Sequence, residues 1–356
     1  MINSNINVRN AGLNIMINWK WNLKDLKDIP KNGYKVFSCF SCGGGSTMGY
    51  KLAGYDVLGN LEIDKKINDI YIKNHNPKYN FCMDIRDFNK LNEYPDELYN
   101  LDILDGSPPC TSFSMAGNRD SDWGKEKQFA EGGKLQTLDD LFFEFIRTAE
   151  ILKPKIIIAE NVSGIIKGKA KGYCNLILKS LNGAGYDTQI FLLNSANMGV
   201  PQSRERVFFI SKQKGYNLPK LILQFNEKPV VFGEVRTENG EALEKSVKYK
   251  ELLKHRKKSD RSIKDIYMRL YNKYSGYNNK IESDNLVCST ITSSGMCFRM
   301  VDGLYLSDTD FINVSTFPQD YDFNNKSVQF LVGMSVPPIM MYRISEQIKT
   351  QWLDKL

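Results

Sequence analysis

The chain is predicted to fold as an α/β protein built on a doubly wound, mostly parallel sheet, with a second, smaller domain. Three observations predict this class. Between residues 34 and 210, short apolar runs alternate with helical patterns, which is typical of strand-helix-strand units. The first run leads into three consecutive glycines, Gly43 to Gly45, and then into a helical pattern. After residue 210 the alternation stops, and a basic, tyrosine-rich stretch follows.

The elements follow from apolar runs and helical spacing. The expected strands are 34–40, 57–63, 101–104, 156–159, 189–193 and 207–210. The expected helices are 47–53, 65–74, 138–152 and 173–183, with a buried turn and helix over 328–348. The expected domains are an N-terminal extension (1–34), the main α/β domain (35–210), the smaller domain (211–286) and a C-terminal segment that returns to the main domain (287–356).

Composition limits the class of protein. The chain has 356 residues, of which 42% are hydrophobic, so it can form a full core. No apolar run approaches the ~20 residues that span a bilayer, and no secretory signal precedes the first domain. Seven cysteines are an odd number and are scattered, which favours reduced thiols. We therefore expect a cytoplasmic protein that does not insert in a membrane.

The charge distribution is uneven. The formal net charge is +7, which permits a nucleic-acid partner without requiring one. Eleven lysines and arginines fall between Lys245 and Lys273, interleaved with Tyr249, Tyr267 and Tyr271. Such a stretch is compatible with a solvated helical surface and equally with contact along a phosphate backbone.

A candidate nucleophile follows the third expected strand. The sequence Ser107-Pro108-Pro109-Cys110 presents a thiol after a turn that two prolines hold in one shape. A buried, inert thiol is the alternative. The next expected strand ends in Glu160-Asn161-Val162, which brings a carboxyl group to an equivalent strand end. Thiol and acid at neighbouring strand ends form a plausible catalytic site.

The glycine-rich turn indicates a nucleotide-like ligand. Glu62 ends the second expected strand, where a carboxylate can accept hydrogen bonds from ribose hydroxyls. Asp84 follows a further unit and could meet an adenine edge. The turn lacks the lysine of a phosphate-binding P-loop and the spacing of dinucleotide-binding enzymes. Cys39 and Cys42 form a C-x-x-C without a second ligand pair, so we expect no metal site.

Taken together, these motifs resemble those of the DNA cytosine-C5 methyltransferases of bacteria and their phages. They occur in the order Phe40-Ser-Cys-Gly-Gly-Gly, Glu62, Asp84, Pro109-Cys110, Glu160-Asn161-Val162 and Gln202-Ser-Arg-Glu-Arg206. The resemblance covers about residues 35–210 and 286–350. It implies the fold of S-adenosylmethionine-dependent methyltransferases, with 35–210 as the catalytic and cofactor-binding domain and 211–286 as a target-recognition domain.

The resemblance implies the roles of the catalytic residues. Cys110 adds to C6 of cytosine, and Glu160, kept protonated by burial, donates a hydrogen bond or proton at N3. Arg204, with Arg206, holds the base carbonyl and helps to keep Cys110 ionised. Asn161 completes this catalytic set. Loss of the C5 proton then expels the cysteine.

The implied cofactor is S-adenosylmethionine, with S-adenosylhomocysteine as product. Phe40 and Ile63 would cover the two faces of the adenine, Glu62 would bind the ribose, and Asp84 with Ile85 would lie at the adenine edge. The complete implied cofactor-binding set is Phe40, Cys42, Gly43, Gly45, Glu62, Ile63, Asp84, Ile85, Pro109 and Ser335. Two positions depart from the family pattern, because Ser38 stands where an acid is usual and Met334 where an asparagine is usual.

The implied partner is double-stranded DNA. A cytosine within a duplex is out of reach, so it would be flipped out before a mobile loop at 111–135 closes. We expect a monomer, with a cognate restriction endonuclease as a possible functional partner. Two alternatives remain: a tRNA cytosine-5 methyltransferase, and a catalytically silent DNA-binding homologue. The basic recognition region favours DNA over tRNA.

Overall fold

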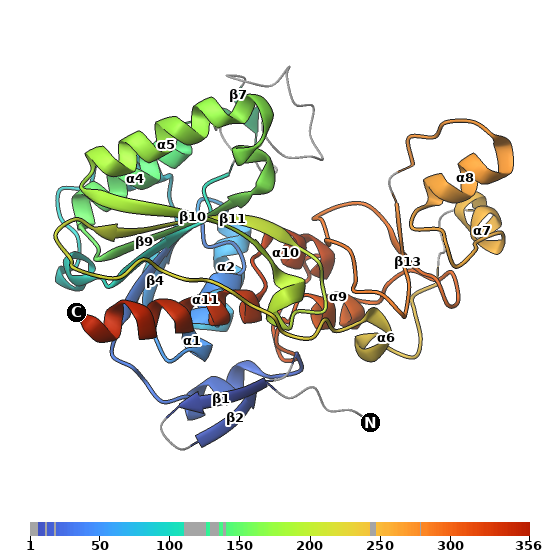
Figure 1. Ribbon diagram of the computed structural model, residues 1–356, viewed down its shortest axis with the longest axis horizontal. Helices are drawn as coiled ribbons and strands as arrows, with labels where there is room; N and C mark the ends of the chain where they lie inside the picture. Colours follow the sequence, from blue (N-terminus) through green and yellow to red (C-terminus); the bar gives the residue numbers. More distant parts are fainter. Residues whose placement is uncertain are drawn as a thin grey trace. The chain divides into compact units, whose positions relative to one another are not determined.

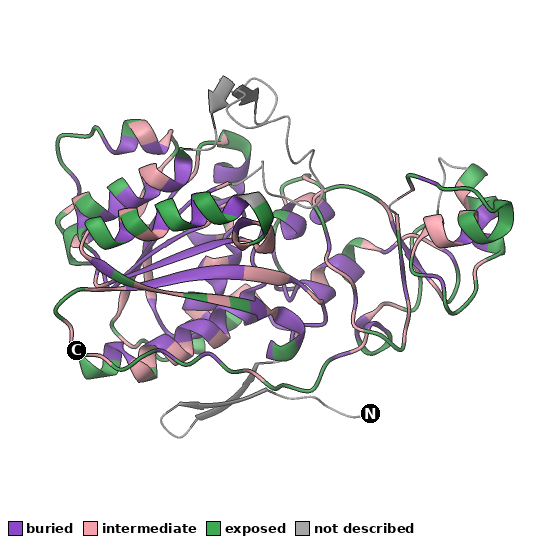
Figure 2. Cartoon of the chain, turned by 45° about the horizontal axis from the view of Figure 1, so that its top comes forward, coloured by how far each residue is buried: buried purple, intermediate pink, exposed green. Residues whose placement is uncertain are grey.

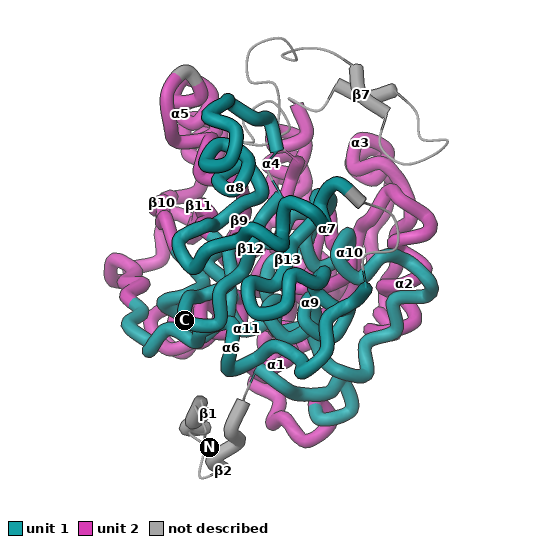
Figure 3. The backbone as a smooth tube through the Cα atoms, turned by 90° about the vertical axis from the view of Figure 1, so that its right-hand side faces the viewer, with its two compact units in different colours: residues 1–25, 194–204, 225–340 teal, residues 26–193, 205–224, 341–356 magenta. Residues whose placement is uncertain are grey.

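A computed structural model describes residues 6–10, 13–17, 19–109, 126–128, 135–137, 140–242, 247–277 and 279–356. The chain divides into two compact units (Figure 3). Unit 1 comprises residues 1–25, 194–204 and 225–340, and unit 2 comprises 26–193, 205–224 and 341–356. These limits differ from the expected domains: 211–224 group with the main sheet, and most of 287–356 groups with the basic stretch rather than with that sheet.

Unit 2 is built on a seven-stranded sheet in the order β10-β11-β9-β6-β3-β4-β5. Its strands are β3 (Lys35–Cys39), β4 (Asp56–Leu61), β5 (Tyr79–Phe81), β6 (Ile103–Gly106), β9 (Ile156–Val162), β10 (Tyr186–Asn194) and β11 (Glu205–Gln213). The pairs from β9 to β5 are parallel, whereas β11 runs antiparallel to β9. The predicted mostly parallel α/β sheet is confirmed, with β5 as a strand that the sequence did not predict.

Helices cover both faces of this sheet. The bounds are α1 (Gly45–Leu52), α2 (Lys65–His75), α3 (Ile85–Phe88), α4 (Leu141–Leu152), α5 (Lys171–Gly183) and α11 (Pro338–Gln351). Figure 1 shows α4 and α5 on one face, and α1 with the C-terminal α11 on the other. Short 3-10 turns lie at 23–28, 96–100, 163–166, 168–170, 195–198 and 353–355. A two-stranded pair, β7 (Glu126–Gln128) and β8 (Leu135–Thr137), precedes α4.

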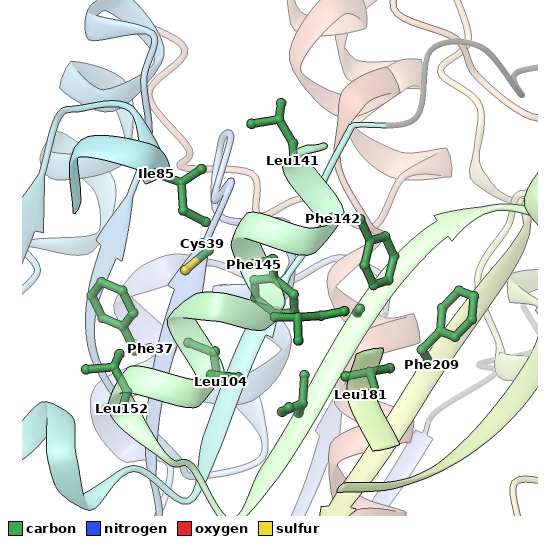
Figure 4. Packing of buried hydrophobic residues seen from close by; sticks show 14 of the residues in the cluster. Phe37, Cys39, Ile85, Leu104, Leu141, Phe142, Phe145, Leu152, Leu181 and Phe209 are labelled. Carbon is green, nitrogen blue, oxygen red and sulfur yellow. The ribbon is translucent and has the colours of Figure 1, made fainter. Parts of the chain in front are cut away.

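The core of unit 2 lies between the sheet and the helices α3, α4 and α5. The inner strands β3, β4, β6, β9 and β11 are mostly buried, whereas most residues of β5 and β10 and the outer helix faces are not (Figure 2). Figure 4 shows Phe142 and Phe145 of α4 among Phe37, Leu104 and Phe209 of the sheet. Phe145 is fully buried, so truncating it to alanine should cost about 3–5 kcal/mol. This packing holds the strands in register.

Unit 1 contains shorter elements. They are β1 (Ile6–Asn10), β2 (Leu13–Ile17), α6 (Phe232–Val235), α7 (Val247–Lys254), α8 (Ile263–Tyr271), β12 (Lys280–Glu282), β13 (Cys297–Arg299), α9 (Asp308–Val314) and α10 (Val328–Met334). A small cluster consisting of Leu252, Leu253, Ile263, Ile266, Ile281 and Phe298 joins α7 and α8 to the two strands. The basic stretch is therefore ordered around its own core.

Two differences from the sequence-based elements concern helices. The expected segment 328–348 is two helices, α10 and α11, because Ser335 adopts an extended conformation and Pro337-Pro338 cannot continue α10. The basic stretch, which showed weak periodicity, contains α7 and α8. Among the described residues, no helix is long and apolar enough to cross a membrane.

Candidate functional site

The carboxyl ends of four parallel strands meet at one edge of the sheet of unit 2. Ser38 in β3 pairs with Asp105 in β6, and Gly106 in β6 pairs with Ala159 in β9. This register brings the turn that starts at Ser107 beside Glu160. In doubly wound sheets, ligands bind in the crevice outside this edge. The edge is therefore where the chemistry of unit 2 is expected.

The carboxyl group of Glu160 is held by a cation. Its Oε1 lies 2.8 Å from Nε of Arg206. Only 9% of Glu160 is exposed, so water screens this pair weakly. Arg206 lies on β11 opposite Val162, at the end of the antiparallel β9/β11 ladder. The structure thus brings Glu160 and Arg206 together, and the protonated state expected for Glu160 stays a prediction.

Asn161 links the end of β9 to the turn after β6. Its side-chain Nδ2 donates to the carbonyl oxygen of Pro108 at 3.1 Å, and its Oδ1 accepts from the backbone N–H of Val162 at 2.9 Å. The residue is buried, which makes the tie rigid. Cys110 follows this turn directly in the sequence but lies outside the described residues, as does most of the predicted loop 111–135.

The glycine-rich turn between β3 and α1 is a strained backbone. Phe40, Cys42 and Gly44 have φ values of 52°, 46° and 76°, in the left-handed region that side chains disfavour. A Cβ atom at Gly44 would lie 2.2 Å from Nε2 of His75. That ring nitrogen is 3.2 Å from the carbonyl oxygen of Gly43. Such strain is concentrated at functional sites.

The side chain of Glu62 supports the turn from the next strand. Its carboxylate accepts the backbone N–H of Cys42 at 2.9 Å and that of Asp64 at 3.0 Å. Burial raises the pKa of Glu62, and these backbone hydrogen bonds act in the opposite direction. A carboxylate has about four lone-pair sites, and the backbone N–H groups of Cys42, Ile63 and Asp64 use at most three of them, which leaves one for a ligand hydroxyl. Ile63 is 45% exposed, so its apolar surface is available at the same edge.

Asp84 and Ile85 have partners within the protein. Asp84 caps α3 by accepting from the N–H of Arg86 at 2.8 Å, and its carboxylate also pairs with Nη1 of Arg86 at 3.1 Å. This contact with Arg86 was not predicted from the sequence. Ile85 is 3% exposed and belongs to the core cluster. Its side chain therefore serves packing, and only its backbone can face a ligand.

Arg204 and Ser335 belong to unit 1. Arg204 is buried and donates from Nη1 to the carbonyl of Ile291 at 3.0 Å and from Nη2 to that of Gly333 at 2.9 Å. The hydroxyl of Ser335 donates to the carbonyl of Leu331 at 2.9 Å. These contacts fix both side chains within unit 1. The base-binding role of Arg204 and the cofactor role of Ser335 stay predictions.

The remaining predicted residues lie at the same edge of unit 2. Gly45 is the first residue of α1, and Pro109 is partly exposed at the end of the described turn. A hollow of about 550 Å³ opens at the opposite, amino-terminal edge of the sheet, beside Lys35, Asp102 and Lys155, and none of the predicted site residues lines it. Within the described ranges, no group of histidine, cysteine or acidic side chains fits a metal ion.

Residues 34–350 match the family model described as C-5 cytosine-specific DNA methylase. Type II methyltransferase M.FnuDI from Fusobacterium nucleatum is 28% identical over 90% of this chain and 96% of its own length. Type II methyltransferase M.NgoPII from Neisseria gonorrhoeae is 34% identical over 51% of this chain. That second match spans only about half of the relative's length, 49%.

Solved structures show the same fold at low sequence identity. A putative DNA modification methyltransferase encoded within an Escherichia coli prophage superposes with a TM-score of 0.64 at 20% identity, covering 90% of this chain and 99% of that one. A mutant of Spodoptera frugiperda DNMT2 superposes with a TM-score of 0.60 at 16% identity, covering 89% and 99%. Both comparisons support the architecture of the sheet.

Proposed function

Because the chain belongs to the family of C-5 cytosine-specific DNA methylases, we propose that it transfers a methyl group from S-adenosylmethionine to C5 of cytosine. The proposed substrate is a cytosine flipped out of a specific double-stranded DNA sequence. The family and the enzyme class predicted from the sequence are confirmed by the match over residues 34–350. The cofactor, the flipped base and the covalent step are proposals.

One observation carries the proposal: an acid and a nucleophile-bearing turn are tied together at adjacent strand ends. Asn161 bonds the carbonyl of Pro108 at 3.1 Å, and its neighbour Glu160 pairs with Arg206 at 2.8 Å. Cys110 is two residues beyond Pro108 in the sequence. A base bound at this edge would meet a thiol from one strand and a carboxyl group from the next.

The proposed chemistry uses these groups in sequence. The Cys110 thiolate adds to C6 of cytosine, and the electron pair of the C5–C6 bond moves toward C5. Glu160 donates a hydrogen bond or proton at N3, which stabilises the charge that builds on the ring. C5 would then take the methyl group of S-adenosylmethionine, which would leave as S-adenosylhomocysteine. Removal of the C5 proton by a base would return the electron pair of the C5–H bond to the ring and expel Cys110 as a thiolate. Arg206 would hold the Glu160 carboxyl group in place throughout.

The glycine-rich edge fits S-adenosylmethionine. When bound, this cofactor supplies a methyl group made electrophilic by its sulfonium. Glu62 would bind the ribose hydroxyls, since the backbone N–H groups of Cys42, Ile63 and Asp64 use at most three of its about four lone-pair sites. Ile63 and Phe40 would provide apolar contacts to the adenine. The strained turn at Cys42 to Gly44 lets the backbone approach the ligand closely.

We further propose that the basic stretch of unit 1 binds the DNA backbone. Lys250, Lys257 and Lys258 are exposed and form no ion pair with any described residue. By contrast, Arg256 donates from Nε to the carbonyl of Met300 at 2.6 Å and has a structural role. Recognition by residues 211–286, a monomeric state, a cytoplasmic site of action in a bacterial or phage-infected cell, and a cognate endonuclease belong to the same proposal.

A mapping experiment tests the function. The protein is incubated with labelled S-adenosylmethionine and either unmethylated genomic DNA or unmodified tRNA, and methylated bases are located at base resolution. We expect 5-methylcytosine within one short DNA sequence, and none with the Cys110→Ser variant. Methylation confined to tRNA would support the tRNA alternative. Bound DNA without methylation of either substrate would support the silent DNA-binding homologue.

A further inference from the structure

An acidic side chain is buried within the central strands of unit 2. Asp105 lies in β6 between Leu104 and Gly106, and it is only 2% exposed. Its Oδ2 accepts a hydrogen bond from the Ser38 hydroxyl at 2.9 Å, and its Oδ1 accepts one from the Tyr50 hydroxyl at 3.1 Å. Burial of a carboxyl group is costly unless such donors satisfy it. Both oxygens of Asp105 are therefore engaged.

The two donors belong to the elements on either side of the glycine-rich turn. Ser38 lies in β3, two residues before Phe40, and Tyr50 lies in α1, which starts immediately after the turn. Both donors are themselves buried. Asp105 thus forms one hydrogen bond to strand β3, which precedes the turn, and one to helix α1, which follows it.

Strand β6, which carries Asp105, leads directly to the turn at residues 107–109 that precedes Cys110, the proposed nucleophile. Ser38 and Asp105 are register partners in the parallel β3/β6 ladder. Beyond Asp105, β6 ends at Gly106, and the chain enters the turn that Asn161 holds at Pro108. One carboxyl group therefore connects the backbone of the proposed cofactor turn with the strand that presents the proposed nucleophile.

We propose that Asp105 is a positioning residue for methyl transfer, which fixes the glycine-rich turn 40–44 relative to the end of β6 through its hydrogen bonds with Ser38 and Tyr50. This inference rests on the proposed function, because the turn matters only if it binds the methyl donor. Ser38 and Tyr50 engage both carboxylate oxygens of Asp105, so we assign Asp105 no direct contact with a reacting group. It acts through the backbone of the turn, so its loss should weaken cofactor binding more than it weakens the fold.

The electrostatic environment supports this role. Burial raises the pKa of Asp105 to about 7, the hydrogen bonds from Ser38 and Tyr50 act in the opposite direction, and the charge of Glu160 raises the pKa further. The carboxyl groups of Asp105 and Glu160 therefore interact electrostatically near the carboxyl ends of β6 and β9. The charge of Asp105 in turn adds to the effect of burial in raising the pKa values of the Cys39 thiol in β3 and of the Tyr71 hydroxyl in α2.

The test compares two buried aspartates of the same segment. Asp105→Asn keeps the shape and removes the charge. Asp102→Asn is the matched control, since Asp102 is also buried and accepts from the backbone N–H of Lys35 at 2.7 Å, but at the opposite end of the strand. The dissociation constant of S-adenosylmethionine is measured by calorimetry without DNA, together with the unfolding midpoint and the KM and kcat for methylation.

The expected result is a split between the two variants. Asp105→Asn should bind S-adenosylmethionine about tenfold more weakly, the effect of losing one hydrogen bond to a charged group, and should raise its KM. Asp102→Asn should bind it as the wild type does. The exchange Ser38→Asp with Asp105→Ser, which returns a carboxyl group to the same register pair, should recover most of the affinity, whereas Tyr50→Phe should lose part of it.

Three outcomes overturn the inference. One is normal cofactor affinity in a folded Asp105→Asn variant. Another is an equal loss in Asp105→Asn and Asp102→Asn that follows their unfolding midpoints, which would indicate a purely structural role. The last is an exchange variant that folds but binds no better than Asp105→Asn. A wild-type protein that binds no S-adenosylmethionine would instead refute the proposed function, and the inference with it.

Discussion

At the scale of single residues, the ion pair between Glu160 and Arg206 can be tested most readily by mutation. Both side chains are largely buried, with 11% and 15% of their side-chain surface exposed. Replacing Arg206 by methionine leaves a buried carboxylate without its cation. We expect the free energy of unfolding to fall by about 3 kcal/mol and methylation to be lost. Urea denaturation measures the first effect and transfer of labelled methyl groups the second.

An exposed pair that involves Glu205, the neighbour of Arg206 on β11, provides the control. Lys167 and Glu205 lie 3.1 Å apart, with 57% and 43% of their side chains exposed. Lys167→Met should cost less than about 1 kcal/mol and leave methylation intact. Equal losses for Arg206→Met and Lys167→Met would contradict the importance assigned to the buried pair.

His75 makes the stability of the fold depend on pH. Burial beneath the glycine-rich turn, helped by the charge of Lys51, lowers the pKa of His75 to about 3. Below about pH 6.5 the His75 ring binds a proton in the unfolded chain but stays neutral in the folded protein. The contribution of His75 to stability is therefore present above pH 6.5 and is lost as the pH falls toward 3.

The difference between wild type and a His75→Gln variant isolates this effect. Between pH 6 and 4, the wild type should lose stability relative to the variant by about 1.4 kcal/mol per pH unit, as measured by urea denaturation at each pH. The chain has one other histidine, His255, which is exposed. His255→Gln should show no such trend, and a flat difference for His75→Gln would refute the expectation.

At the scale of elements, the turn between β3 and α1 depends on Gly44. Its φ is +76°, and a Cβ atom there would lie 2.2 Å from the His75 ring. Gly44→Ala should therefore displace the turn and weaken S-adenosylmethionine binding more than tenfold. Left-handed backbone strain alone costs up to about 2 kcal/mol, so with the added clash the protein should be destabilised by more than about 2 kcal/mol. Thermal unfolding and calorimetric titration measure the two effects.

Gly185 separates backbone strain from crowding. It has a φ of +93° but nothing within 4 Å of an added Cβ atom. Gly185→Ala should cost about 1–2 kcal/mol for the left-handed backbone alone, with unchanged cofactor affinity. If both alanine variants bind the cofactor equally well, the shape of the turn at Gly44 is not what positions the ligand.

Helices and strands could be predicted where the sequence pattern that marks them lies within the element itself. Apolar runs such as Ile156 to Ala159 reveal buried parallel strands directly, and helix α2 begins at the predicted residue, where Asp64 caps it. Strand β5 has only three residues, none fully buried, so it carried no detectable pattern. Pro337 and Pro338 mark the start of α11 in the sequence, but apolar spacing alone does not reveal that the segment before them is the helix α10 and not a turn.

In the candidate site, too, single residues could be predicted from the sequence, whereas contacts between distant residues could not. Residues that follow a strand end, such as Glu62 and Glu160, were found from sequence position alone. The Arg206 contact to Glu160 and the Arg86 contact to Asp84 depend on strand register and side-chain direction, which sequence spacing does not give. The environment of Asp105 had one local signal, an acid inside an apolar strand, but its donors come from β3 and α1.

At the scale of the whole molecule, the basic stretch predicts strongly salt-dependent DNA binding. Each lysine that neutralises a phosphate contributes roughly 0.9 to the slope of log affinity against log salt concentration. The triple variant of Lys250, Lys257 and Lys258 to alanine should reduce that slope by about 2 to 3. Fluorescence anisotropy with a labelled duplex at several salt concentrations measures it.

A neighbouring arginine serves as the control. Arg256 donates to the carbonyls of Leu253, Met300 and Val301, so Arg256→Ala should lower stability while changing the slope by no more than about one lysine's share. An unchanged slope in the triple lysine variant would place the DNA-binding surface elsewhere.

The central claim is that this enzyme methylates C5 of cytosine through attack by Cys110, and covalent trapping tests it most directly. The protein is incubated with S-adenosylmethionine and a DNA duplex in which 5-fluorocytosine replaces cytosine, since fluorine cannot leave as the C5 proton does. We predict a protein–DNA adduct that survives denaturation, with the base attached to Cys110 by mass spectrometry, and no adduct with Cys110→Ser. A wild-type protein that methylates ordinary DNA yet forms no adduct, or an adduct that persists in Cys110→Ser, would contradict the account.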